Sequence, residues 1–221
     1  MSRESIASGF YIVGEGNDGT GKSTQIDLLA QYLEKEFDLE TYVMHEPDGS
    51  PISSEIRTII KNGSLERDAV TNLLLFTASR HETWFREARP VLARGGVVLS
   101  ARNELSSEIY QGVGEGLGVE YVREVTRAFM DERYMNPDLT VIFTLQDAIR
   151  KQRIAKRGEL ENPDTFESRG DDFQTLVDGG YASIATERGF PTIDASRSIT
   201  TVQRSFRRLA VRAMVAKGLS A

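Results

Sequence analysis

The stretch from Gly16 to Ser23 reads Gly-Asn-Asp-Gly-Thr-Gly-Lys-Ser and fits the pattern G-x-x-x-x-G-K-[ST]. An apolar run, Phe10–Val13, precedes it and predicts a buried strand, while Thr24–Leu33 has apolar residues at helical spacing. In this context the glycines let backbone N–H groups face a phosphate, and the helix directs its positive dipole end at the same anion. The alternative is a glycine-rich turn with an accidental lysine, and the strand pattern before the loop and the helix pattern after it disfavour this alternative.

This loop supplies the predicted binding site for ATP. We expect Lys22 to reach the β- and γ-phosphates, and we expect the Ser23 hydroxyl to bind Mg²⁺. The predicted ATP-binding residues of the loop are Gly16, Asn17, Asp18, Gly19, Thr20, Gly21, Lys22, Ser23 and Thr24.

The composition limits what else the chain can be. Its 221 residues suit a single α/β domain, and its net charge of -6 disfavours non-specific nucleic-acid binding, which relies on Lys and Arg. The absence of cysteine excludes disulfides and thiolate metal sites and fits a cytoplasmic protein. No apolar run is long enough for a signal peptide or a transmembrane helix, so we expect no membrane association.

Apolar runs alternate with helical patterns along the chain, which favours a parallel sheet covered on both faces. The predicted strands are Gly9–Gly14, Thr41–His45, Val97–Ser100, Leu139–Leu145 and Pro191–Asp194. The predicted helices are Lys22–Phe37, Ile52–Asn62, Asp68–Ala88, Val91–Arg94, Val119–Tyr134, Asp147–Lys156, Asp171–Arg188 and Thr200–Lys217. Because ligands of such sheets bind beyond the carboxyl ends of the strands, the residues after each strand are the main site candidates.

Several candidates have two readings. By spacing alone, Arg57 reads as a surface arginine rather than a phosphate ligand. Phe76 and Arg80 share a helix face and could hold a planar base, but by spacing alone a core Phe beside a rim Arg is the favoured reading. The glycine-rich segment Gly112–Gly118 predicts a flexible loop. The polar run at 159–172 predicts either a lid over phosphates or a solvated loop.

Six motifs in order make the chain resemble the thymidylate kinase family from Gly9 to about Val202. They are Glu15–Thr24 (EGxDGxGKST), Glu46–Ser50 (EPGGT), Leu74–Arg80 (LLFxAxR), Arg102–Gly112 (DRYxxSSxAYQG), Pro137–Thr140 (PDLT) and the basic stretch Arg153–Gly158 before the family's lid. The resemblance implies an α/β, three-layer P-loop NTPase fold with a five-stranded parallel sheet and a lid at about 158–172. It also implies phosphoryl transfer from ATP with Mg²⁺ to dTMP, and a homodimer for which the helix Asp68–Ala88 is the candidate interface.

The resemblance also assigns roles to single residues. Phe76 would stack on thymine and Arg80 would hydrogen-bond it, while Arg57 and Arg102 would hold the acceptor phosphate. The implied acceptor-binding set is Glu46, Arg57, Phe76, Arg80, Arg102, Ser106, Tyr110 and Gln111. On the donor side, Arg153 would pack on adenine. The implied catalytic set is Lys22, Arg102, Asp18 and a lid arginine, Arg157 or Arg169, with Asp18 and Ser23 near the metal.

The chain departs from the family pattern at positions that bear on chemistry. Ala101 stands where the pattern has the Asp of DRY, and Thr165 stands where it has a lid arginine. A transition-state arginine can be worth on the order of 10³-fold in rate. Two alternatives therefore remain: a kinase for another deoxynucleoside monophosphate, and a nucleotide-binding homologue with little activity.

Overall fold

The computed structural model describes residues 9–156, 166 and 169–218. In this part of the chain five parallel strands form one sheet in the order β2-β3-β1-β4-β5. The strands are β1 (Phe10–Glu15), β2 (Thr41–His45), β3 (Val97–Ala101), β4 (Leu139–Thr144) and β5 (Thr192–Asp194). All five predicted strands are confirmed, with ends that shift by no more than one residue. The predicted α/β class and parallel sheet are confirmed with them.

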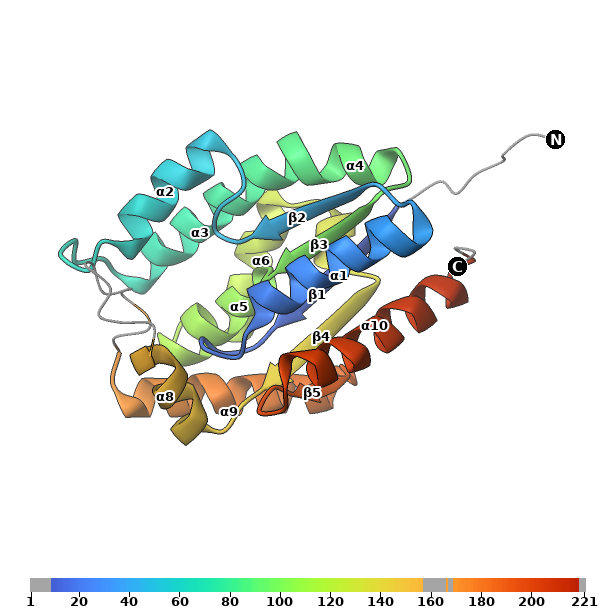
Figure 1. The fold of residues 1–221 in the computed structure, drawn as a ribbon. Helices are drawn as coiled ribbons and strands as arrows, with labels where there is room; N and C mark the ends of the chain where they lie inside the picture. Colours follow the sequence, from blue (N-terminus) through green and yellow to red (C-terminus); the bar gives the residue numbers. More distant parts are fainter. Residues whose placement is uncertain (1–8, 157–165, 167–168, 219–221) are drawn as a thin grey trace.

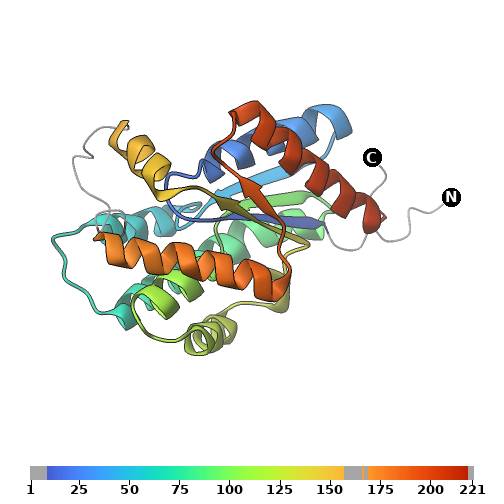
Figure 2. The same cartoon turned by 90° about the horizontal axis from the view of Figure 1, so that it is seen from below.

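Helices cover both faces of the sheet (Figures 1 and 2). They are α1 (Lys22–Phe37), α2 (Pro51–Lys61), α3 (Ala69–Thr83), η1 (Trp84–Ala88), α4 (Arg89–Ala93), α5 (Glu104–Ser107), η2 (Glu108–Gly114), α6 (Val119–Phe129), α7 (Glu132–Met135), α8 (Asp147–Lys156), α9 (Asp171–Arg188) and α10 (Ile199–Ala216). Within the described residues no helix is both long enough and apolar enough to cross a bilayer.

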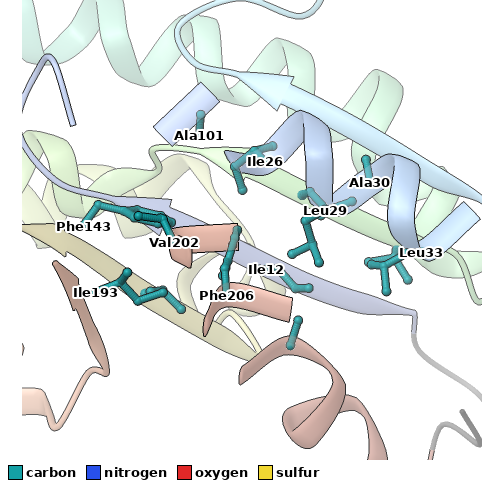
Figure 3. Close-up of a cluster of buried hydrophobic side chains, with 14 of the residues drawn as sticks. Ile12, Ile26, Leu29, Ala30, Leu33, Ala101, Phe143, Ile193, Val202 and Phe206 are labelled. Atoms are coloured by element: carbon teal, nitrogen blue, oxygen red, sulfur yellow. The ribbon is translucent and has the colours of Figure 1, made fainter. Parts of the chain in front are cut away.

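The two faces of the sheet have separate cores because side chains alternate along a strand. Phe10 and Ile12 of β1 pack on one face with apolar side chains of α1 and α10, as Figure 3 shows around Ile12, Leu29 and Phe206. Tyr11 and Val13 pack on the opposite face with residues of η1, α4 and α7. A third cluster continues that opposite face between η2 and α9. This arrangement holds the carboxyl ends of β1, β2 and β3 beside one another.

Three predicted segments were wrong in detail. The predicted helix Asp68–Ala88 is α-helical only to Thr83 and then widens into the π-helical turn η1, just before Pro90, which has no N–H for a regular helical bond. The predicted helix Val119–Tyr134 breaks at Met130, which is extended. The Asp131 side chain then accepts a hydrogen bond from the Tyr134 N–H and caps α7.

The third correction concerns the segment predicted as a flexible loop, Gly112–Gly118. Its first three residues belong to η2, and the Leu117 and Gly118 N–H groups donate to the carbonyls of Gln111 and Gly112. Buried contacts of Ile109 and Tyr110 with α9 hold this turn in place. The predicted lid at 158–172 lies largely outside the described residues, as do Arg157 and Thr165.

Candidate active site

The loop Gly16–Ser23 joins β1 to α1, as its sequence predicts. Gly16 has φ 139°, and a Cβ there would lie 2.3 Å from the Phe143 carbonyl oxygen, so only glycine fits. The Lys22 Nζ donates to the Asn17 carbonyl at 2.8 Å, and the Thr20 hydroxyl donates to the same oxygen at 2.9 Å. The Lys22 ammonium group is therefore held by a backbone carbonyl of its own loop.

Two cavities adjoin this loop. The smaller, of about 130 Å³, is lined by residues that include Lys22, Ser23, Asp18 and the buried Ala101. The larger, of about 330 Å³, is bordered by Arg153, whose guanidinium donates to the Ala195 carbonyl at 2.8 Å. A loop of backbone N–H groups, a lysine and an open groove beside it can take a polyphosphate with an attached base.

A third cavity, of about 280 Å³, lies across the ends of β2 and β3 and brings the predicted acceptor residues together. It is lined by Asp18, Ser23, His45, Glu46, Pro47, Arg57, Ile60, Lys61, Phe76, Arg80, Arg102, Ser106, Tyr110, Gln111 and Phe166. All eight residues of the predicted acceptor set are in this lining. Asp18 and Ser23 border this cavity and the small phosphate-loop cavity alike, so the two spaces meet at these residues.

Arg80 is held rigidly at this cavity. Its Nε donates to the Glu46 carboxylate at 2.6 Å, its Nη1 donates to the Ser107 hydroxyl at 2.7 Å, and its guanidinium lies 5.3 Å from the Phe76 ring centroid. Glu46 also accepts from the Tyr134 hydroxyl at 2.9 Å. Burial alone would lower the pKa of Arg80, but Glu46 outweighs it and raises that pKa, so the guanidinium is charged. Glu46 thus orients Arg80.

Arg102 follows β3 with a left-handed backbone, φ 82°, which is unusual for a residue other than glycine. Its guanidinium pairs with Asp18 of the loop and donates to the Ser106 hydroxyl at 2.9 Å. Such backbone strain is typical of functional sites, where the surrounding contacts enforce it. The contact places a positive charge where the phosphate loop meets the acceptor cavity.

Asp18 is ionised in this environment. Burial alone would raise the pKa of Asp18, but the positive charges of Arg102 and Lys22 outweigh burial and lower that pKa to about 2. The Tyr110 hydroxyl also donates to Asp18, at 3.1 Å, and burial raises the pKa of Tyr110 well above its usual value. The described residues contain no group of three or more His, Asp or Glu side chains arranged to hold a metal ion.

The other predicted residues have clear positions. Arg57 lines the acceptor cavity with its side chain 40% exposed, 3.8 Å from Asp48, so both of its predicted readings fit that placement. Arg169 pairs with Glu115 and lies over the rings of Phe166 and Phe173.

Sequence reasoning missed several residues of the site. Glu15, fully buried at the end of β1, accepts hydrogen bonds from the Asn103 and Ser106 N–H groups and from the Tyr181 hydroxyl. Its place as the first residue of the motif Glu15–Thr24, directly before the loop, was the available signal. Phe166, whose ring centroid is 5.6 Å from that of Phe76, carried no local signal, because ninety positions separate the two in sequence.

Comparisons with known proteins decide the family. The thymidylate kinase family model matches residues 15–206. The thymidylate kinase of Exiguobacterium sibiricum is 37% identical over 199 residues, which cover 89% of this chain and 91% of that protein. The chain belongs to the thymidylate kinase family.

Two further comparisons are consistent with membership of this family. The thymidylate kinase of Symbiobacterium thermophilum is 36% identical over 202 residues, 90% of this chain and 91% of that protein. The crystal structure of the thymidylate kinase from Ehrlichia chaffeensis superposes with a TM-score of 0.73 at 23% identity, over 92% of this chain and 99% of that one, which shows the shared fold. As a member of the thymidylate kinase family, the chain is a phosphotransferase.

Proposed function

We propose that this chain transfers the γ-phosphoryl group of ATP to dTMP and produces dTDP and ADP. The observation that carries the proposal is the single acceptor cavity that joins Phe76 and Arg80, suited to a base, with Arg102 beside the phosphate loop. The base would stack on Phe76 and accept a hydrogen bond from Arg80, whose orientation Glu46 maintains. Tyr110 would crowd the 2′ position and favour deoxyribose, and Gln111 would lie near the base.

The chemistry needs positioning and charge neutralisation more than covalent catalysis. An oxygen of the acceptor phosphate attacks the γ-phosphorus in line, and the bond to the bridging oxygen of ADP breaks. Lys22, Arg102 and an arginine of the segment after α8, Arg157 or Arg169, would stabilise the charge on the transferred group. A general base is unnecessary because a phosphate monoester is largely ionised near neutrality, with a second pKa of roughly 6.

The residues present also suit Mg²⁺. The Ser23 hydroxyl and the Asp18 carboxylate border the same cavity and are the hard oxygen donors that Mg²⁺ prefers beside substrate phosphates. Bound there, Mg²⁺ would neutralise charge on the phosphate oxygens.

We further propose a single cytoplasmic kinase domain that works as a homodimer through α3 and α6. Four large apolar side chains are exposed on these helices, Val70, Leu74, Tyr121 and Phe129. Light scattering at the mass of one chain would contradict the dimer.

An ADP-release assay with ATP, Mg²⁺ and a panel of monophosphates tests the activity. Turnover with dTMP far above that with other acceptors supports the proposal, whereas turnover with a different deoxynucleoside monophosphate supports the first alternative. Ala101 and Thr165, which stand where the family pattern has Asp and Arg, favour the second alternative, a binding protein with little activity. Nucleotide binding without turnover across the panel would establish it. Lys22→Ala should abolish turnover while the circular dichroism spectrum is unchanged.

A further inference from the structure

The side chain of Asn17, within the phosphate loop, is turned toward α9. It is 3% exposed, and its Nδ2 donates to the Asp178 carboxylate at 2.8 Å and to the Gln174 side-chain oxygen at 3.2 Å. Its Oδ1 accepts from the Asp18 N–H at 2.7 Å. Every polar atom of this buried amide therefore has a partner, which makes its position well defined.

The same residue holds the lysine of the loop. The Asn17 carbonyl accepts from Lys22 Nζ, while the Asn17 side chain is anchored on α9. Because the peptide unit is planar, the anchor restrains the carbonyl of residue 17 and the N–H of residue 18 together. The place of Lys22 and the orientation of Asp18 thus depend on two side chains of a helix more than 150 positions away in sequence.

Gln174 extends this contact to the acceptor cavity. Its Nε2 donates to the Phe166 carbonyl at 2.8 Å, and the Phe166 ring lines the cavity with Phe76 and Tyr110. Asn17, Gln174 and Asp178 themselves are absent from the lining of the acceptor cavity and of the two cavities beside the phosphate loop. Gln174 and Asp178 are therefore placed to act on a bound nucleotide through Asn17 and its loop, without touching the nucleotide.

We propose that Asn17, Gln174 and Asp178 form a polar bridge in which the two residues of α9 position the phosphate loop for ATP. They are positioning residues, and the loop binds ATP tightly only while the bridge is intact. The proposal rests on the proposed function for the identity of the donor nucleotide.

The decisive variants exchange the donor and the acceptor of the hydrogen bond between Asn17 and Asp178. Asn17→Asp keeps the acceptor for the Asp18 N–H but removes the Nδ2 donor and sets a second carboxylate against Asp178. We expect it to raise the Kd for the ATP analogue AMP-PNP by about tenfold or more, since the lost bond is to a charged group. Adding Asp178→Asn supplies a donor from the other side and should return the Kd to within about threefold of the wild type. Glu187→Gln, the same acid-to-amide change at an exposed site on α9, is the matched control and should leave the Kd unchanged.

Isothermal titration calorimetry with Mg²⁺ and AMP-PNP measures these constants without any need for turnover. In the kinase assay the bridge should act mainly on the KM for ATP, a selectivity that general destabilisation would not produce. An unchanged Kd in Asn17→Asp, or no recovery in the double variant, overturns the proposal. If Asn17→Asp does not fold, Gln174→Met and Asp178→Ala decide, and an unchanged Kd in both overturns it. A wild-type chain that binds AMP-PNP but does not phosphorylate dTMP contradicts the proposed function alone.

Discussion

Replacing Glu46 by alanine should destabilise the protein strongly, because it leaves a buried arginine without its counter-ion. The Glu46 and Arg80 side chains are each 2% exposed and meet at 2.6 Å. In the variant, Arg80 keeps its bond to the Ser107 hydroxyl but loses its carboxylate, and the Tyr134 hydroxyl loses its acceptor. Although both residues border the acceptor cavity, their side chains are almost completely shielded from solvent.

The expected loss follows from what such pairs cost when one partner is removed. Breaking a buried ion pair from one side costs about 3–5 kcal/mol, which is a large part of the total stability of a domain. For a protein of this length, each kcal/mol corresponds to about 2–4 °C in Tm, so the fall should be about 6–20 °C. Glu46→Gln keeps an oxygen for Arg80 and should lose clearly less.

A double variant separates stability from binding. Glu46→Ala with Arg80→Met removes the unpaired charge and should be more stable than Glu46→Ala alone, because an apolar replacement of a buried pair is often neutral. Calorimetric dTMP binding should stay weak in both variants, since neither has a correctly held Arg80. Thermal unfolding and dTMP titration of the wild type and three variants make up the experiment. A fall in Tm below about 3 °C for Glu46→Ala, or a double variant less stable than it, would refute the reasoning.

Three further perturbations test single residues. Phe76→Ala should raise the KM for the acceptor far more than the KM for ATP, because Phe76 borders the acceptor cavity but neither of the two cavities beside the phosphate loop. Equal increases of the two KM values would contradict base stacking. The pKa of Asp18 is lowered in the folded protein from 3.8 to about 2, so its ionised form stabilises the fold above pH 4 and this contribution is lost as the pH falls to 2. Asp18→Asn should therefore remove about 2 kcal/mol of pH dependence from urea unfolding over that range, and an unaltered profile would be inconsistent with the ion pair. Ala101→Asp should lower the Mg²⁺ concentration needed for half-maximal turnover, while an unchanged requirement would mean that Ser23 and Asp18 suffice.

The sequence alone determined the elements whose signals are local. The phosphate loop is recognisable because its glycines, Lys22 and Ser23 are adjacent, and its strand and helix flank it directly. The three central strands, β1, β3 and β4, were predicted nearly to the residue because continuous apolar runs are typical of strands buried on both faces. Predictions were wrong after Met130, where the Asp131 cap starts a new helix, and at η1, where Pro90 lacks the N–H of a regular helical bond, because these local features outweigh the periodicity.

Only the tertiary structure decided how the site residues act on one another. Motif order pointed to Glu46 and Arg80 as separate ligands, but the fold shows that one holds the other, across 34 positions of sequence. It also brings Asn17 to Asp178 and Phe166 to Phe76, for which spacing carries no information. The physical reason is that local propensity acts over a few residues, whereas a buried charge or amide takes whichever partner the packed elements bring within hydrogen-bond distance.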